Sequence, residues 1–119
     1  MPKSDFMNVN IAVLCDDLAS AIDKTYQRLP WAMKHEAVAR LKRQAHGLSQ
    51  EVQKAQDSRG PAPTQRHLRE ALSLAHECVP LLSLVLKKNL LSQELHDRWI
   101  KQLGVIEMRL EEWRTAGEA

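Results

Sequence analysis

The chain has 119 residues, of which 44% are hydrophobic but only 4% aromatic, and its formal net charge is +2. This length suits one domain with a single hydrophobic core, and the shortage of aromatic residues favours helices packed through Leu, Val, Ile and Ala over a β-sheet. No apolar stretch approaches the ~20 residues that a membrane-spanning helix needs, and no amino-terminal stretch resembles a secretory signal. We therefore expect a cytoplasmic protein with no membrane role.

Four segments repeat apolar or small residues at alternating steps of three and four, the spacing that lines one face of an α-helix. They predict helices over about residues 8–29, 34–56, 65–88 and 93–115. The fold class that follows is all-α, an antiparallel up-down-up-down four-helix bundle in a single domain over residues 1–119. Its core is predicted to include Leu18, Ile22, Leu41, Leu48, Leu72, Leu82, Trp99, Ile106 and Leu110.

Capping and helix-breaking residues mark the ends of these helices. Three polar residues are candidate amino-terminal caps of the first helix: Ser4, Asn8 and Asn10. This helix is predicted to end before Pro30, because a proline disfavours the α conformation in the residue before it. Residues 57–64 contain two prolines and a glycine and are predicted to form the longest loop, with Thr64 capping the third helix. Asn89 suits the end of that helix, and Ser92 suits the start of the fourth.

The third helix is apolar on nearly every side between residues 78 and 86. Its core-facing stripe is predicted to be Leu68, Leu72, Ala75, Val79, Leu82 and Leu86. A helix in a four-helix bundle buries only one face, so the other apolar side chains favour a homo-oligomer. Pro80 is expected to kink this helix. The alternative to an oligomer is that Pro80 rotates the stripe and that long neighbouring side chains cover the remaining apolar surface. The candidate interface residues of the oligomer are Leu81, Leu84, Val85 and Leu90.

No pattern in the sequence is typical of a catalytic or metal site. Cys15 and Cys78 lie far apart without CxxC spacing, so we expect reduced core residues and no disulfide or zinc site. None of the five histidines has a carboxylate residue three positions before it, which di-iron bundles require. Because GxSxG motifs and glycine-rich phosphate loops are also absent, we expect a protein that is not an enzyme and uses no metal or cofactor.

Charge is distributed unevenly along the chain. Between residues 24 and 69 ten Lys or Arg stand against three acidic residues, whereas both flanks are net acidic. Lysines and arginines along one helix face are what a phosphate backbone selects. The candidate nucleic-acid-binding residues are Arg40, Arg43, Lys54, Arg59, Arg66 and Arg69. The alternative is that these cations pair with acidic residues of the first helix, namely Asp16, Asp17 and Asp23.

Several segments resemble a known family of bacterial four-helix bundles. The similar segments are residues 26–30 (Tyr-Gln-Arg-Leu-Pro), 34–55, 82–95 with the turn at 87–92, and 105–113. They resemble the proteins encoded in intervening sequences of large-subunit ribosomal RNA genes and the accessory proteins of diversity-generating retroelements. The similarity covers most of the chain from Tyr26 onward and consists of hydrophobic and turn positions.

The resemblance implies a bundle that assembles into a five-membered ring. In the retroelement branch it also implies a basic ring that binds nucleic acid and a reverse transcriptase. Two functions follow from the sequence as alternatives. One is a non-enzymatic oligomeric scaffold or adaptor that binds RNA or DNA, and the other is a module that binds only a protein partner through its apolar third helix.

Overall fold

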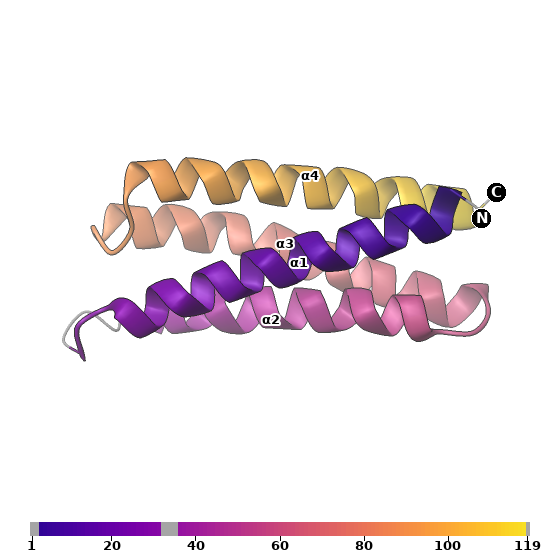
Figure 1. Ribbon diagram of the computed structural model, residues 1–119, viewed down its shortest axis with the longest axis horizontal. Helices are drawn as coiled ribbons and strands as arrows, with labels where there is room; N and C mark the ends of the chain where they lie inside the picture. The colour runs from indigo at the N-terminus through magenta and orange to yellow at the C-terminus, as the bar shows by residue number, and fades with distance from the viewer. Residues whose placement is uncertain (1–2, 32–35, 119) are drawn as a thin grey trace.

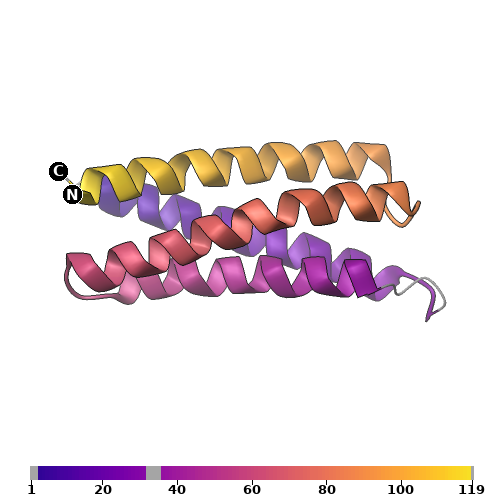
Figure 2. The same ribbon diagram turned by 180° about the vertical axis from the view of Figure 1, so that it is seen from behind.

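Four helices run alternately up and down along one long axis in the computed structural model, which describes residues 3–31 and 36–118 (Figure 1). The helices are α1 (Lys3–Arg28), α2 (Glu36–Asp57), α3 (Pro61–Lys87) and α4 (Gln93–Glu118). Each helix packs against the next, and α4 returns to α1, so the four surround one core (Figure 2). The bundle measures 48 × 21 × 21 Å. The predicted all-α antiparallel four-helix bundle is confirmed.

The core follows the predicted stripes of α1, α2 and α4. All nine residues predicted for it are buried, with exposures of 6% or less. The buried stripe of α2 consists of Val38, Leu41, Ala45, Leu48, Val52 and Ala55, and on α4 the buried stripe runs from Trp99 to Trp113. Burying one Leu, Ile or Val side chain contributes ~1.5–3 kcal/mol, so these stripes supply most of the drive to fold. Within the described residues, no helix has the length and hydropathy needed to cross a membrane.

On α3 two members of the predicted stripe, Val79 and Leu86, are wrong, whereas Leu82 between them is buried as predicted. Cys78 and Val85 face the core, at 0% and 1% exposure, whereas Val79 is 36% exposed. From Ala75 onward the buried residues follow at steps of three, four and three, namely Cys78, Leu82 and Val85. The predicted stripe used steps of four, three and four. Both orders place apolar residues on one face, because α3 is apolar on nearly every side here. Val85 therefore belongs to the core of the single chain, and the expectation that it is free for an interface is wrong.

Pro80 lies within α3 without ending the helix. It is exposed, and α3 continues through it to Lys87. An interior proline removes one backbone hydrogen bond and costs ~3 kcal/mol. The buried positions on either side of Pro80 keep their alternating spacing, so the proline does not rotate the stripe.

The connection between α2 and α3 is shorter than the predicted loop over residues 57–64. Only residues 58–60 separate the two helices. Gly60 has φ of 95° and precedes Pro61, the first residue of α3. Prolines are tolerated in the first turn of a helix, because the N–H that they lack would have no intrahelical partner there. Pro61 and Pro63 therefore lie in the first turn of α3 and do not extend the loop. Thr64 lies inside that turn and donates its hydroxyl to the carbonyl of Gly60 at 2.9 Å, so the prediction that Thr64 caps the helix is wrong.

At the other end of α3 both predicted capping residues are confirmed. Asn89 adopts φ of 61°, and the N–H of Leu90 donates to the carbonyl of Val85 at 3.1 Å. A residue in the left-handed conformation followed by a 6→1 backbone hydrogen bond is the Schellman motif, a common carboxy-terminal cap of helices. Ser92 Oγ accepts a hydrogen bond from the backbone N–H of Leu95 at 3.2 Å and caps α4.

The boundaries of α1 and α2 differ modestly from the prediction. Because α1 already begins at Lys3, the three candidate caps Ser4, Asn8 and Asn10 lie inside the helix. It ends at Arg28, two residues before Pro30, as predicted from the effect of proline on the residue before it. The predicted start of the second helix at residue 34 lies outside the described residues, and α2 is described from Glu36.

Candidate nucleic-acid interface

The antiparallel pairing of α2 and α3 decides which basic side chains lie together. Gln44 of α2 donates a hydrogen bond to Glu77 of α3, and nearer the connection His67 Nδ1 lies 2.7 Å from Glu51 Oε2. These two contacts fix the register of the pair. Residues just after Glu51 on α2 are therefore level with residues just before His67 on α3.

This register gathers four of the six candidate residues at the end of the bundle where α2 meets α3. Lys54 of α2 is level with Arg66 of α3, Arg59 lies in the connection, and Arg69 lies one helical turn along α3. All four residues are exposed. We call them the loop-end basic group: Lys54, Arg59, Arg66 and Arg69.

The other two candidates, Arg40 and Arg43, lie apart from this group. At 1.5 Å per residue, they are ~16–21 Å from Lys54 along α2. Arg43 Nη2 also lies 3.0 Å from Glu36 Oε1, and Glu77 of α3 is level with this part of α2. The structure thus divides the six candidate residues into two areas, and the loop-end basic group is the larger.

Two of the acidic residues of α1, Asp16 and Asp23, have partners other than the six candidate cations. Lys42 Nζ lies 3.0 Å from Asp23 Oδ1 and 4.9 Å from the centroid of the Tyr26 ring. Asp16 accepts a hydrogen bond from the hydroxyl of Ser49. Among the side chains that the structure describes, none of the six candidate cations forms an ion pair with Asp16, Asp17 or Asp23. Pairing with these three residues in the same chain therefore does not explain why the six candidates are basic.

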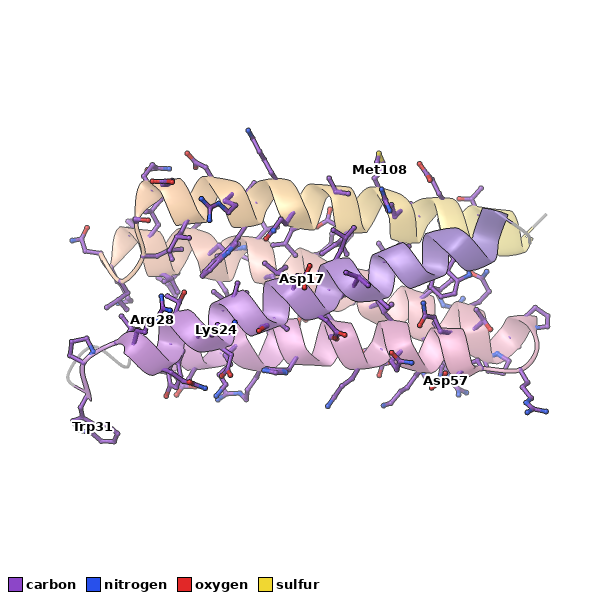
Figure 3. All side chains as sticks on the ribbon, in the orientation of Figure 1. Asp17, Lys24, Arg28, Trp31, Asp57 and Met108 are labelled. Carbon is purple, nitrogen blue, oxygen red and sulfur yellow. The ribbon has the colours of Figure 1, made fainter. Side chains whose placement is uncertain are left out.

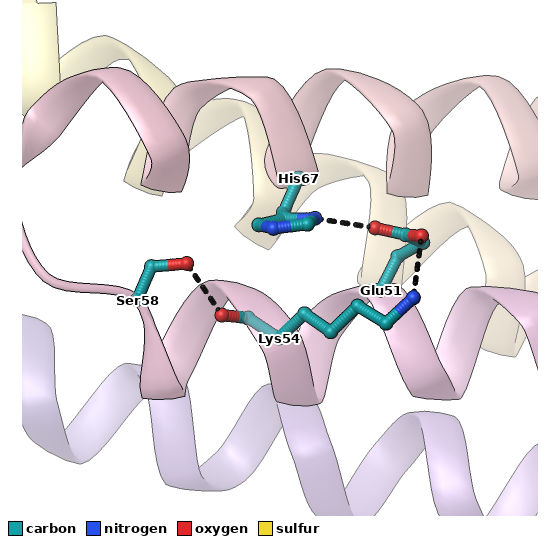
Figure 4. Close-up of polar contacts among 4 residues, drawn as sticks. All are labelled: Glu51, Lys54, Ser58 and His67. Carbon is teal, nitrogen blue, oxygen red and sulfur yellow. Dashed lines mark hydrogen bonds and ion pairs between the residues drawn. The ribbon is translucent and has the colours of Figure 1, made fainter.

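A small polar cluster ties α2 to α3 beside the loop-end basic group (Figure 4). The Glu51 carboxylate, only 16% exposed, contacts His67 of α3 and also lies 3.5 Å from Lys54 Nζ. The hydroxyl of Ser58 donates to the carbonyl of Lys54 at 2.6 Å and closes the end of α2. This cluster was not predicted, because Glu51 and His67 are brought together only by the three-residue connection between the helices.

A groove of about 310 Å³ lies between α2 and α3 near the other end of the pair. Its lining residues are Arg40, Gln44, Glu77, Pro80, Leu81 and Leu84. Two of the four candidate interface residues, Leu81 and Leu84, thus line one groove, and Leu84 is 40% exposed. Leu90 is half-buried against the core in the turn before α4, and Val85 lies inside the core.

The two thiols lie where they are chemically inert. Cys15 and Cys78 are both buried and free of disulfides. Burial in apolar surroundings raises the pKa of each thiol to about 12, helped by nearby carboxylates. Because the thiolate is the reactive form, neither side chain is a nucleophile near neutral pH. Among the described residues, no three side chains of the metal-binding types converge.

Comparison with known proteins shows similarity in fold. No protein-family model matches the chain, and no curated protein matches its sequence. The fold is similar to the crystal structure of a protein of unknown function from the S23 ribosomal protein family of Bacteroides thetaiotaomicron, with a TM-score of 0.85. The similarity covers 92% of this chain and 98% of that protein at 16% sequence identity. At this identity it establishes the fold alone, and function must be argued from the surface.

Proposed function

We propose that this protein is a non-enzymatic, oligomeric scaffold that binds RNA or DNA through the sugar-phosphate backbone. The observation that carries the proposal is the loop-end basic group, four exposed cations that α2, α3 and their connection bring to one end of the bundle. Three of the four are arginines, whose planar guanidinium groups match two phosphate oxygens at once.

The chemistry of this surface favours binding without sequence preference. The loop-end basic group contains no aromatic side chain that could stack on a base, so contacts to phosphate would dominate the affinity. In a ring each subunit would repeat the group, and weak contacts would then act together through multivalency. Arg40 and Arg43 would add a second, smaller area.

Two similarities support the proposal. The segments described above resemble ribosomal RNA intervening-sequence proteins and retroelement accessory proteins, and this resemblance implies a pentamer and, in the retroelement branch, nucleic-acid binding. The similar fold of a protein assigned to a ribosomal protein family supports the four-helix bundle on which this arrangement of charges depends. Neither the proposal nor these similarities involves a catalytic step, a metal or a cofactor.

The test is fluorescence anisotropy of labelled single-stranded RNA and duplex DNA across a range of salt concentrations. Binding should weaken steeply with salt, each phosphate contact adding about −0.7 to −0.9 to the slope of log K against log salt. The double substitution Arg66→Glu and Arg69→Glu should abolish binding. The matched control is Lys87→Glu with Lys88→Glu, which makes the same charge change at the opposite end of α3 and should leave most of the affinity.

The second candidate function is a protein-interaction module with no nucleic-acid role. It is favoured by the exposed apolar side chains Val79 and Leu84, which α3 does not bury within the chain. If the unaltered protein retains neither RNA nor DNA at low salt, or if both double variants lose binding equally, the basic group is not a specific nucleic-acid surface and this second function takes its place.

A further inference from the structure

Trp31 is 88% exposed, the highest value among the large hydrophobic residues whose side chains the structure describes. It follows the end of α1, and its ring points away from the bundle (Figure 3). Trp99 and Trp113, by contrast, are only 2% and 9% exposed. A tryptophan ring left in water forgoes the burial of ~150–250 Å², and tryptophan is among the residues that most often dominate the energy of a protein interface.

The groove between α2 and α3 has the size and lining to receive such a ring. Pro80, Leu81 and Leu84 give it an apolar wall from α3, and polar residues of α2 and α3 line the rest. Its volume of about 310 Å³ is at the lower end of the range of ~300–1,000 Å³ that is typical of small-molecule sites. A single aromatic side chain suits this space better than a larger ligand does.

The charges around the groove and around Trp31 are complementary. Arg40 lines the groove, and a guanidinium group stacks favourably on the face of an indole. Glu77 lines the groove as well, and Arg28, exposed at the end of α1, precedes Trp31 by three residues in the sequence. The segment that carries the ring is therefore basic, and the groove contains a carboxylate of opposite charge.

We propose that the α2–α3 groove receives Trp31 of a second copy of this chain. Trp31 points away from its own bundle, so its own groove is not the site it fills (Figure 3). The ring and the groove are different surfaces of one molecule, and repeating such a head-to-tail contact closes into a ring when the rotation between copies allows it. This inference rests on the oligomeric part of the proposed function and is independent of nucleic-acid binding.

The experiment combines light scattering with quenching of tryptophan fluorescence by iodide. Trp99 and Trp113 are buried, so quenching reports on Trp31. In the unaltered oligomer Trp31 should be protected, and Leu84→Glu, which changes only the groove, should make it fully quenchable. Leu84→Glu and Trp31→Ala should each reduce the mass to that of the 13.6 kDa monomer. Trp31→Phe should keep the oligomer, because it preserves an aromatic ring.

The matched control is Met108→Ala, which removes another exposed apolar side chain, 54% exposed on α4. It should change neither the mass nor the quenching. An oligomer in which Trp31 is already fully quenchable, or which Leu84→Glu leaves intact, would overturn this inference and leave the proposed oligomeric scaffold standing. A monomer at every concentration of the unaltered protein would overturn both.

Discussion

His67 Nδ1 of α3 lies 2.7 Å from Glu51 Oε2 of α2, close to the point where the chain turns between the two helices. The pair is mostly buried, with side-chain exposures of 20% and 16%. It fixes the register of α2 and α3, and it places one negative charge beside the cations of the loop-end basic group. The Glu51 carboxylate is responsible for both the register and the negative charge. A substitution that removes its charge but keeps a hydrogen-bonding group separates the two effects.

Glu51→Gln should strengthen nucleic-acid binding. The amide keeps a hydrogen-bonding group opposite His67 but removes a charge next to Lys54, which should improve affinity by about 0.5–1 kcal/mol at low salt, roughly two- to fivefold. The gain should shrink as salt rises, because exposed charges are screened. Anisotropy titrations measure it, with Glu112→Gln on α4 as the control. An equal gain in the control would show that net charge matters and the position of Glu51 does not.

Substitutions by Ala should distinguish buried apolar positions from exposed ones. Leu48 and Ile106 are both fully buried, so replacing either by Ala should cost about 2–5 kcal/mol of unfolding free energy. Val105, adjacent to Ile106 but 38% exposed, should cost clearly less when replaced by Ala. Urea unfolding gives these values. Similar losses at positions 105 and 106 would contradict the orientation of α4.

Two glycines should respond to Ala in opposite directions. Gly60 has φ of 95°, so Gly60→Ala should cost about 1 kcal/mol from backbone strain, although the space around its Cβ position is nearly open. Gly104 lies within α4 and nothing approaches its Cβ position within 4 Å, so Gly104→Ala should stabilise by about 0.5–1 kcal/mol. Thermal unfolding measures both shifts. Gly60→Ala as stable as the unaltered protein would show that the turn is built differently.

The buried thiols should make the fold sensitive to alkali. In the folded chain the pKa of Cys78 is raised to about 12, whereas an exposed thiol ionises near 8.5–9. Below that range the thiol is neutral in both states and its contribution to stability is fully present. Above it only the unfolded chain ionises, and about 1.4 kcal/mol is lost per pH unit until the folded pKa is reached. Unfolding free energies at several pH values above 9 should therefore fall less steeply for Cys78→Ala.

Most of the fold could be predicted because apolar spacing is a local property of the sequence. On α2 the residues outside the buried stripe are mostly polar, so only one register was available to that helix. On α3 that contrast is missing, and the sequence could not distinguish Val79 from Cys78 as the core residue. The role of Thr64 was similarly ambiguous, because threonine is a common amino-terminal cap of helices. The positive φ of Gly60, which places the start of α3 at Pro61, cannot be seen in the sequence.

The candidate site was predictable in its residue types and not in its arrangement. Basic residues are visible in the sequence, but their division into two areas depends on the register of α2 and α3, which the contact between Glu51 and His67 reveals. Trp31 was not among the residues predicted to form an interface. The signal available in the sequence was its position directly after Leu29 and Pro30, outside every apolar helical stripe.

The three-residue connection between α2 and α3 also bears on how the chain acquires its shape. Bringing two segments together costs less entropy when few residues separate them, so these helices should meet first during folding. Helices α1 and α4 are the first and last in the sequence, so the contacts between them have a high sequence separation and should form late. We expect a transition state in which Leu48 and Leu68 already make their native contacts while Ile11 has yet to dock.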